Sequence, residues 1–375
     1  MNLNIAFARN LRQKRRELGL TQKNLAEMLG QGYTEKAVSK WESGNNLPPS
    51  SILPKLAFIL KTNIDSLMRE PTEKTYYLGI DGGGTKTDFA LEDENGSILR
   101  RTIEDGCNPN TVGISTTKLI LKNGILKICD GVDLSSVIVF AGISGCKTGN
   151  YEKDIRDLFN EMGFEKYDVG SDNDNIIAAG LGNSEGISVI LGTGICAYAV
   201  TKQGSHRIAG WGYLFDNGGS AFHIGRDAIS SIYSYYDGSG KETTLVSRIE
   251  ELSGCSGTEL LKKLYNDGNK LVASYAVAVF EEAEKGDEIA VSILKENFNE
   301  VARIIRSALK YFSNHSEPVP VFIAGGLTNR SDILKHIKDA MEQDSNRCEW
   351  HILSSSPVEG AVLIAKKMRG ESDGK

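Results

Sequence analysis

The sequence predicts an all-α N-terminal domain followed by a larger α/β domain. Apolar residues recur at helical spacing through residues 1–70, and Gly, Thr and Pro stand where helices begin or end. From residue 75 onward, short apolar runs end in glycine-rich turns, which is typical of strand ends. The charge divides at the same point: residues 1–70 hold 11 Lys and Arg against six Asp and Glu, and the remainder holds 32 against 43.

Size and composition indicate a globular protein of two or three domains, since the chain has 375 residues of which 40% are hydrophobic. No apolar run approaches the roughly 20 residues that cross a bilayer, and residues 1–10 lack the pattern of a signal peptide. We therefore expect a cytoplasmic protein with no membrane partner. The six cysteines contain no CxxC pair, so we expect reduced thiols and neither disulfides nor a zinc site.

Five short helices are expected in residues 1–70. The first covers residues 5–18 and ends before Gly19, and the second is capped by Thr21 and ends at Leu29. Within the second helix we expect Leu25 and Met28 to face inward. After two prolines, a run of apolar residues closes a small helical core: Ile52, Leu53, Leu56, Ala57, Leu60, Ile64 and Leu67.

The third helix has two distinct faces. Thr34 caps it, it ends before Gly44, and Val38 and Trp41 share its buried face. Its other face carries Lys36, Ser39 and Lys40. Such a polar, basic face is what a recognition helix presents to a major groove.

The order TQKNLAEMLG, KAVSKWESG and ID-x-L resembles the lambda-repressor/Cro (XRE-type) helix-turn-helix family over residues 5–68. One departure is a turn about two residues longer than usual at Gln31 and Gly32. The resemblance implies binding to a double-stranded DNA operator, with Gln22 on the backbone and Lys36, Ser39 and Lys40 on base edges or phosphates. The alternative is a protein-interaction module of the same fold.

A polar linker over residues 71–74 precedes the segment TYYLGIDGGGTKTDFALED, which predicts a strand, a glycine turn and a second strand. Glycines let backbone N–H groups approach an anion, Thr85 adds a hydroxyl donor and Lys86 adds a positive charge. Because a strand rather than a helix follows, the turn is neither a Walker P-loop nor a dinucleotide fingerprint.

Two later segments repeat the pattern of a strand followed by a glycine turn. Residues 187–191 run into Gly192-Thr193-Gly194, and residues 319–324 run into Gly325-Gly326. Residues 273–311 read as a long helical stretch, broken near Gly286, that covers a sheet, and residues 356–365 read as a closing helix.

This set resembles the actin/Hsp70/sugar-kinase superfamily, and within it the BadF/BadG/BcrA/BcrD-type ATPases and the eukaryotic-type N-acetylglucosamine kinases. The likeness covers nearly all of residues 75–368, including IAGWGYLFDNGGSAFHIGRDA at 208–228. It implies an actin-like (ribonuclease H-like) domain of two α/β lobes, each on a mixed five-stranded sheet, that hold ATP, Mg²⁺ and a sugar in a cleft. Lobe I would comprise residues 75–170 and 355–375, and lobe II residues 171–354.

The resemblance also assigns roles to residues. Asp81 would sit beside Mg²⁺, and Asp172 is a candidate catalytic base. The nucleotide would contact Asp81, Gly82, Gly83, Gly84, Thr85 and Lys86, then Gly192, Thr193 and Gly194, and finally Gly325 and Gly326. The sugar would contact Asn108 or Asn110, Lys147, Asp172 and Asp216.

Three positions depart from the kinase pattern. Lys147 stands where the kinases usually have the aspartate that takes the proton from the sugar, and an ammonium is a poor base at neutral pH. Ile195 replaces a serine, and Asn217 replaces a glutamate. These changes predict weakened or absent phosphoryl transfer with ligand binding retained. Lys147 paired with a phosphate would instead favour a phosphorylated sugar.

Other conspicuous residues have plainer interpretations. Trp211 either stacks on a sugar or packs in the core, and His206 and His223 lack metal-ligand spacing and are interpreted as structural. The leading functional hypothesis is a transcriptional regulator, homodimeric on a near-palindromic operator, that responds to a sugar or nucleotide. The alternatives are an active amino-sugar kinase with a DNA-binding head, and an ATPase that activates another protein.

Overall fold

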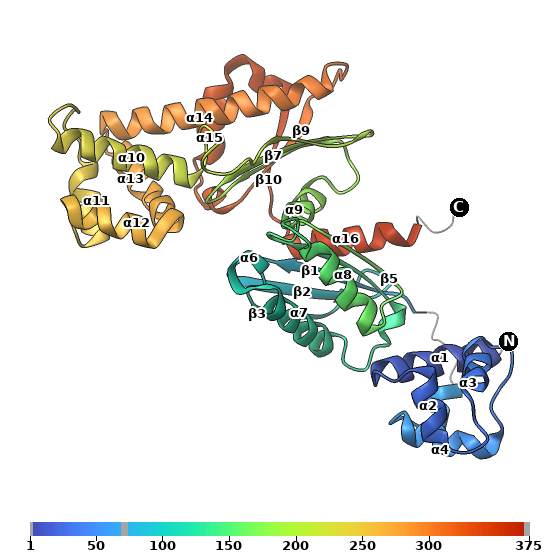
Figure 1. The fold of residues 1–375 in the computed structure, drawn as a ribbon. Coiled ribbons are helices and arrows are strands. Elements are labelled where there is room, and N and C mark those ends of the chain that lie inside the picture. Colours follow the sequence, from blue (N-terminus) through green and yellow to red (C-terminus); the bar gives the residue numbers. More distant parts are fainter. Residues whose placement is uncertain (1–2, 69–73, 371–375) are drawn as a thin grey trace. The chain divides into compact units, whose positions relative to one another are not determined.

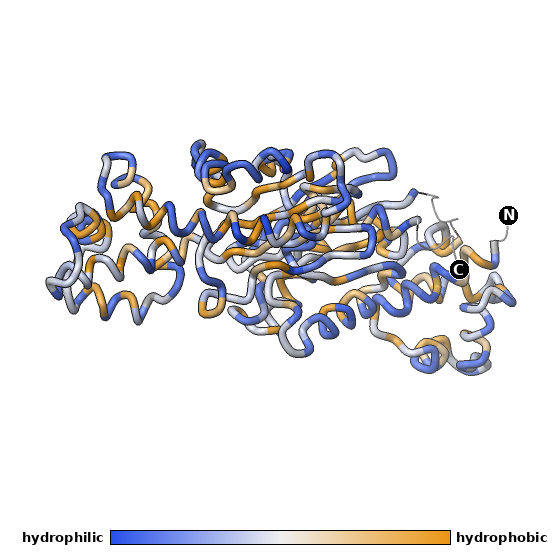
Figure 2. The backbone as a smooth tube through the Cα atoms, turned by 90° about the horizontal axis from the view of Figure 1, so that it is seen from above, coloured by the Kyte–Doolittle hydropathy of each residue, from blue (hydrophilic) through white to orange (hydrophobic). Residues whose placement is uncertain are grey.

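The computed structural model describes residues 3–68 and 74–370, so residues 71–73 of the expected linker lie outside the described part. The chain divides into two compact units, one formed by Met1–Ala179 with Ser356–Lys375 and the other by Gly180–Ser355. The first unit holds the N-terminal helices and one sheet, and the second holds the other sheet (Figure 1). Hydrophobic and hydrophilic residues alternate along the helices (Figure 2).

The N-terminal domain is helical, as predicted. It comprises α1 (Leu3–Glu17), α2 (Gln22–Leu29), α3 (Glu35–Glu42), a 3₁₀ turn at Ser50–Ile52, α4 (Leu53–Ile59) and α5 (Ile64–Met68). The side chains of Thr21 and Thr34 cap α2 and α3 by accepting hydrogen bonds from Asn24 N and Ala37 N. The expectation that Met28 faces inward is wrong, since it is 49% exposed. Leu25, Ala26 and Leu29 form the buried face of α2 instead.

One buried ion pair joins two helices of the N-terminal domain (residues 3–68), which we call the head. Arg15 donates two hydrogen bonds to Glu42, from Nε to Oε1 at 2.6 Å and from Nη2 to Oε2 at 3.0 Å, and the Glu42 side chain is 1% exposed. Arg12 Nη2 donates to the Glu42 carbonyl at 2.7 Å. Part of the basic charge of α1 is therefore used inside the domain, where it joins the first helix to the end of the third.

The first sheet has the strand order β3-β2-β1-β4-β5. Its strands are β1 (Tyr76–Gly82), β2 (Lys86–Glu92), β3 (Ile98–Asp105), β4 (Val137–Ile143) and β5 (Lys166–Gly170). β1, β4 and β5 are parallel, whereas β2 and β3 are antiparallel additions at one edge. The helical elements of this unit are α6 (Pro109–Val112), α7 (Ile114–Ile128), a 3₁₀ turn at Leu134–Ser136, α8 (Tyr151–Met162), α9 (Asp172–Leu181) and α16 (Pro357–Gly370).

Both faces of this sheet are covered. Leu78, Ile80 and Val139 pack into one apolar cluster with α7 and α8, and Tyr77 and Phe140 pack into another with α16. A Cβ at Gly79 would lie 2.6 Å from the carbonyl oxygen of Val358, so only glycine lets α16 approach β1 this closely. The closing helix predicted near the C-terminus thus completes the first unit.

The second sheet has the order β10-β9-β6-β7-β8, so both sheets are mixed and five-stranded as expected. Its strands are β6 (Gly186–Leu191), β7 (Ile195–Thr201), β8 (Gly204–Ala209), β9 (Val319–Ala324) and β10 (Cys348–Ile352). The α-helices are α10 (Ala221–Tyr236), α11 (Leu245–Ser253), α12 (Gly257–Ser274), α13 (Ala276–Glu284), α14 (Glu288–Leu309) and α15 (Ile333–Met341), with 3₁₀ turns at Lys310–Phe312, Gly326–Asn329 and Glu342–Arg347. α14 buries Val301 and Ile305 in one core with the strands, so the long helical stretch covers the sheet as predicted.

Replacing Glu42 with alanine is expected to destabilise the N-terminal domain by about 3–5 kcal/mol, because the buried Arg15 guanidinium would lose its counter-charge. Hydrogen exchange read by mass spectrometry should show lost protection in residues 5–68 and none in residues 75–368. Glu35→Ala, at an exposed position of α3, is the matched control. Equal protection in the two variants would contradict this role for the ion pair.

Candidate functional site

Parallel strands bring the predicted residues of the first unit to one edge of the sheet. β1, β4 and β5 run in the same direction, so their carboxyl ends lie together (Figure 1). Asp81 stands at the end of β1, Lys147 follows β4, and Asp172 begins the helix after β5. Asp172 lies close enough to raise the pKa of Asp81 by charge repulsion.

The first glycine turn exposes the groups predicted to meet phosphate. Gly83 N donates to the Lys86 carbonyl at 2.9 Å, which closes the turn between β1 and β2. Gly84, Thr85 and Lys86 are exposed. A Cβ at Gly106 would lie 2.5 Å from the Gly84 carbonyl, so the chain after β3 supports the turn from behind.

Burial raises the pKa of Asp81 to about 6. The hydrogen bond from Asn175 Nδ2 to Asp81 Oδ1, at 2.7 Å, opposes that rise, while the charges of Asp172 and Asp88 add to it. The ionised Asp81 is thus costly in the protein alone, and a bound cation would favour it.

Asn175 holds this corner together, and sequence reasoning missed it. Its side chain is fully buried and its Nδ2 also donates to the carbonyls of Ile80 at 3.3 Å and Gly142 at 3.2 Å. Its Oδ1 has no hydrogen-bond partner among the described residues. The sequence signal that could have found it is its position in α9, three residues after Asp172. A polar residue there lies on the helix face that is turned to the sheet.

The segment GCNPN packs against the turn after β4. Asn108 Nδ2 donates to Ser144 Oγ at 3.4 Å, and Asn110 Nδ2 donates to the Gly145 carbonyl at 3.4 Å. Gly145 has φ +78°, and a Cβ there would lie 2.6 Å from Asn108 Oδ1. Both candidate sugar ligands therefore lie beside the segment that carries Lys147.

Lys147 and Asp172 contact different partners. Lys147 Nζ lies 3.8 Å from Asp174 Oδ2 and its side chain is 59% exposed. Asp172 Oδ1 accepts from Ser171 Oγ and from Asn173 N, both at 3.1 Å. Asp172 thus keeps a carboxylate at this edge, while Lys147 supplies a positive charge there.

In the second unit, two glycine loops follow the neighbouring parallel strands β6 and β9. Gly192 N donates to Gly194 O at 2.9 Å, and α10 begins against this turn, with Phe222 N donating to Thr193 O at 3.1 Å. Gly325 has φ +100°, and a Cβ there would lie 2.5 Å from the Leu191 carbonyl, so this position requires glycine.

A cavity of about 510 Å³ lies at these loops. It is lined by Gly192, Thr193, Ala221, Lys270, Ala273, Ser274, Ala276, Val277, Phe280, Gly326, Leu327, Asn329 and Arg330. Three of the predicted residues, Gly192, Thr193 and Gly326, line it, whereas Gly194 and Gly325 do not. The sequence did not predict that α12 and α13 form one wall of this cavity. Helical periodicity shows which side of each helix is apolar, but not which loop packs against that side.

Asp216 shapes its own loop. Its Oδ1 accepts from Gly210 N at 3.2 Å and its Oδ2 from Gly212 N at 2.9 Å. Its contact with a sugar stays a prediction. Trp211, within this loop, is 61% exposed, so the interpretation as a core tryptophan is wrong. Its ring lies at the surface, with the Arg207 guanidinium 5.3 Å from the ring centroid.

The two histidines make contacts typical of structural residues. His206 stacks on Tyr311 with ring centroids 4.6 Å apart, and His223 Nδ1 lies 2.7 Å from Ser220 Oγ. Burial lowers the pKa of His223, which therefore stays neutral. Within residues 3–68 and 74–370, no cluster of three or more His, Cys, Asp or Glu has the geometry of a metal site.

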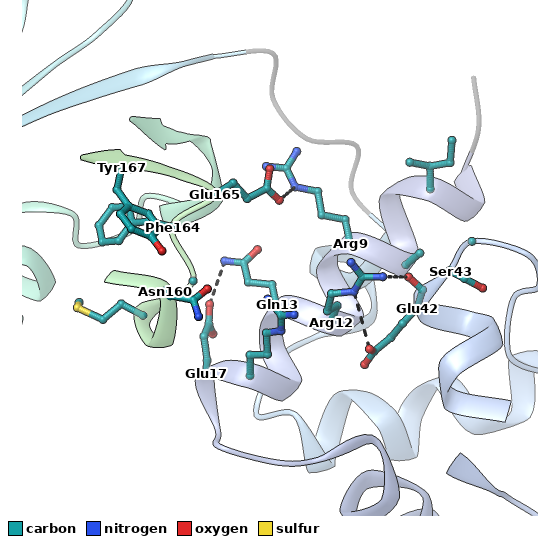
Figure 3. A pocket seen from close by; sticks show the side chains of 16 residues that line it. Arg9, Arg12, Gln13, Glu17, Glu42, Ser43, Asn160, Phe164, Glu165 and Tyr167 are labelled. Carbon is teal, nitrogen blue, oxygen red and sulfur yellow. Dashed lines mark hydrogen bonds and ion pairs between the residues drawn. The ribbon is translucent and has the colours of Figure 1, made fainter. Parts of the chain in front are cut away.

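The head presents three of the four residues predicted to meet DNA. Lys36, Ser39 and Lys40 are exposed on α3, whereas Gln22 is half-buried and its Nε2 donates to Glu42 Oε2 at 2.8 Å. None of the four lines the pocket of about 610 Å³ to which α1 contributes Arg9, Arg12 and Arg16 (Figure 3), although Glu42, the partner of Gln22, does. The polar face of α3 is thus separate from the arginine-lined side of α1.

Two α/β units, each on a mixed five-stranded sheet with glycine turns, preceded by a helix-turn-helix domain, define a fold of the actin and sugar-kinase type with a helical N-terminal head. The chain belongs to the BadF/BadG/BcrA/BcrD ATPase family, whose model matches residues 78–365. A helix-turn-helix model matches residues 11–67.

Curated relatives cover the larger domain. An N-acetylmuramic acid/N-acetylglucosamine kinase of Clostridium acetobutylicum is 28% identical over 301 residues, and an N-acetyl-D-glucosamine kinase of Dictyostelium discoideum is 30% identical over 313. Each match covers 78% of this chain and 98% of the relative.

Solved structures share the fold. A putative N-acetylglucosamine kinase from Chromobacterium violaceum has a TM-score of 0.62 at 21% identity, with 78% of this chain and all of that chain covered. A ROK family transcriptional regulator, a homologue of the E. coli MLC protein, has a TM-score of 0.51 at 13% identity, with 98% of this chain and 96% of that chain covered.

None of the helices in residues 3–68 and 74–370 combines the length and the apolar character needed to cross a membrane.

Asp81→Asn is expected to stabilise the protein at pH 7.5, by up to about 3 kcal/mol, because the neutral amide avoids the cost of burying a charge. The raised pKa means that wild-type stability is lost as pH rises from about 4 through about 6, so the advantage of the variant should disappear near pH 4. Melting curves across pH 4–8 measure this. An advantage that is equal at both ends of the range would contradict the shifted pKa.

Proposed function

We propose that this chain is a DNA-binding transcriptional regulator whose kinase-like domain binds a nucleotide and an amino sugar. The observation that carries the proposal is the exposed polar face of α3, formed by Lys36, Ser39 and Lys40 on a helix whose opposite face is buried. The basic N-terminal domain on an acidic remainder supports the proposal, since this distribution is expected where only the N-terminal domain meets phosphate.

The ligand half of the proposal rests on both units. In the first, the Gly83–Lys86 turn offers N–H groups, a hydroxyl and an ammonium to phosphate, and Asp81 would hold Mg²⁺. Its buried carboxylate, whose ionisation a cation favours, fits that ion. In the second, the cavity of about 510 Å³ is of the size of nucleotide and cofactor pockets. The names of the relatives support an N-acetylated amino sugar as the second ligand.

Reduced phosphoryl transfer follows from two of the changed positions. Lys147 places an ammonium where the kinases usually have a carboxylate base. Ile195 is buried and lies against the backbone at Gly219, so hydrocarbon fills the position of the missing hydroxyl. Binding needs neither group, whereas proton transfer needs a base.

The second candidate function is an active amino-sugar kinase with a DNA-binding head. Asp172 favours it, because a half-buried carboxylate remains beside Asp81 at the edge where the sugar is expected. The relatives named as kinases match almost their full length.

The Lys36→Ala/Lys40→Ala double variant is expected to bind promoter fragments, recovered by repeated in vitro selection, at least about tenfold more weakly. The slope of log K against log salt should fall by about one to two units, because each lysine that contacts a phosphate releases a counterion. Lys202→Ala/Lys262→Ala removes the same charge from exposed positions of the second unit and should leave both quantities unchanged. A double variant that keeps the affinity and the salt slope of the parent protein would contradict the DNA-binding proposal.

Incubation with ATP, Mg²⁺ and N-acetylglucosamine separates the two candidates. We expect the ligands to raise the melting temperature, because they bind only the folded state, while ADP release stays near background. ADP release at rates typical of kinases, abolished by Asp172→Asn, would overturn the binding-only proposal and establish the kinase.

A further inference from the structure

A second cavity of the second unit, of about 460 Å³, lies between α13, α14 and α15. It is lined by Phe280, Ala283, Glu284, Val291, Leu294, Lys295, Phe298, Asn299, Asp332, Lys335, His336, Asp339, Ala340 and Glu342. The predicted nucleotide loops contribute nothing to this lining. The cavity is therefore distinct from the one at Gly192 and Gly326.

The floor of this cavity is aromatic and apolar. Phe298 and His336 stack with ring centroids 4.8 Å apart and planes 7° apart, and Phe280 meets Phe298 edge-on at 6.2 Å. Phe280, Leu294 and Phe298 are each at most 3% exposed as residues. The ring that a ligand can reach is therefore His336, whose side chain is 29% exposed and which the buried Phe298 supports from behind. A flat apolar body can stack on such a ring.

The rim is acidic. It carries four acidic residues and two lysines: Glu284, Asp332, Asp339, Glu342, Lys295 and Lys335. Lys335 already forms an ion pair with Asp339, with Nζ 2.9 Å from Oδ2. The lining carries four carboxylates against two ammonium groups, and the imidazole Nε2 of His336 lies 3.4 Å from Asp332 Oδ2. The charge complement of this rim is a cation.

Arg330 shows where that cation would sit. Its guanidinium bonds Glu284, and also bonds Asp332 with Nη2 to Oδ2 at 3.0 Å, while lying 4.4 Å from the centroid of Phe280. Arg330 lines the neighbouring cavity of about 510 Å³, and Phe280 lines both. Two rim carboxylates and an aromatic wall therefore already hold one cation, supplied from the other side.

We infer that this cavity binds a small organic cation with a flat apolar body, such as an aromatic amine. The body lies against the ring of His336, whose other face is stacked on Phe298, and the ammonium takes a position at Glu284 and Asp332 in competition with Arg330. Because Arg330 also lines the cavity at Gly192 and Gly326, occupancy of the second cavity changes the charge available to the first. This inference does not depend on the identity of the ligand in the first cavity.

Three probes of one shape and different charge test the site on the full chain by calorimetric titration. Tryptamine carries a cation, 3-ethylindole is neutral and indole-3-propionate is an anion. We expect tryptamine to bind at least about tenfold more tightly than either of the others, since two carboxylates receive it. Equal binding of the three, tighter binding of the propionate, or no binding of tryptamine would overturn the inference.

Substitutions test whether tryptamine binds in this cavity and whether it competes with Arg330 for the two carboxylates. Glu284→Gln/Asp332→Asn should weaken tryptamine by about fivefold or more, whereas Arg330→Gln should strengthen it by about twofold to fivefold because the two acids are released. Val291→Trp, at a position 47% exposed on the rim, should block the cavity while the protein stays folded. Glu288→Gln is the control for charge, since Glu288 lies on α14 outside the lining and its side chain is 86% exposed.

Either of two results would show that the amine binds elsewhere. One is weaker tryptamine binding in Arg330→Gln, and the other is unchanged tryptamine affinity in both Glu284→Gln/Asp332→Asn and Val291→Trp. The melting curve of each variant, read in the same buffer, separates lost binding from lost folding.

Discussion

The candidate site of the first unit depends on one buried amide, that of Asn175. It lies where β1, β4, α9 and α16 meet, and its Nδ2 joins the end of β1 to the end of β4 while contacting Asp81. Two glycines, Gly142 and Gly360, leave the space that Asn175 occupies. A Cβ at Gly142 would lie 2.2 Å from Asn175 Oδ1, and one at Gly360 would lie 1.9 Å from the Asn175 carbonyl. The place and the ionisation of Asp81 follow from this packing.

Charge is handled differently in each part of the chain. In the head, Glu42 neutralises the buried Arg15, which joins α1 to α3 and leaves the lysines of α3 exposed. At the edge of the first sheet, an exposed lysine stands beside carboxylates, which suits binding of an anion better than removal of a proton. In the second unit, Arg330 serves two carboxylates and lines a different cavity.

The comparison with known proteins supports the same division. The larger domain belongs to the BadF/BadG/BcrA/BcrD ATPase family and shares its fold with proteins named as amino-sugar kinases. The curated kinase relatives match 78% of this chain and 98% of their own length. A regulator of the ROK family shows a fold likeness over 98% of the chain, so a head on a kinase-like body has a structural counterpart.

Local signals in the sequence determined the helices, strands and glycine turns, because caps, helical periodicity and residues without Cβ act within a few positions. Thr21, Thr34, Val38 and the turn at Gly83 could therefore be placed correctly from sequence alone. These signals did not fix which side of a short helix faces the core: Met28 is exposed because the eight-residue α2 buries only a narrow face.

Only the tertiary structure decided how distant side chains pair. From the sequence, Asn175 and Arg330 had no predicted role, and Asp216 had only a role in sugar binding. The sequence did not predict that Asn175 bonds Asp81, that Asp216 closes its own loop, or that Arg330 lies over Phe280. These pairings arise from the convergence of strand ends and helix faces far apart in the chain. Local propensity carries no information about such contacts, since their free energy appears only when the core has formed.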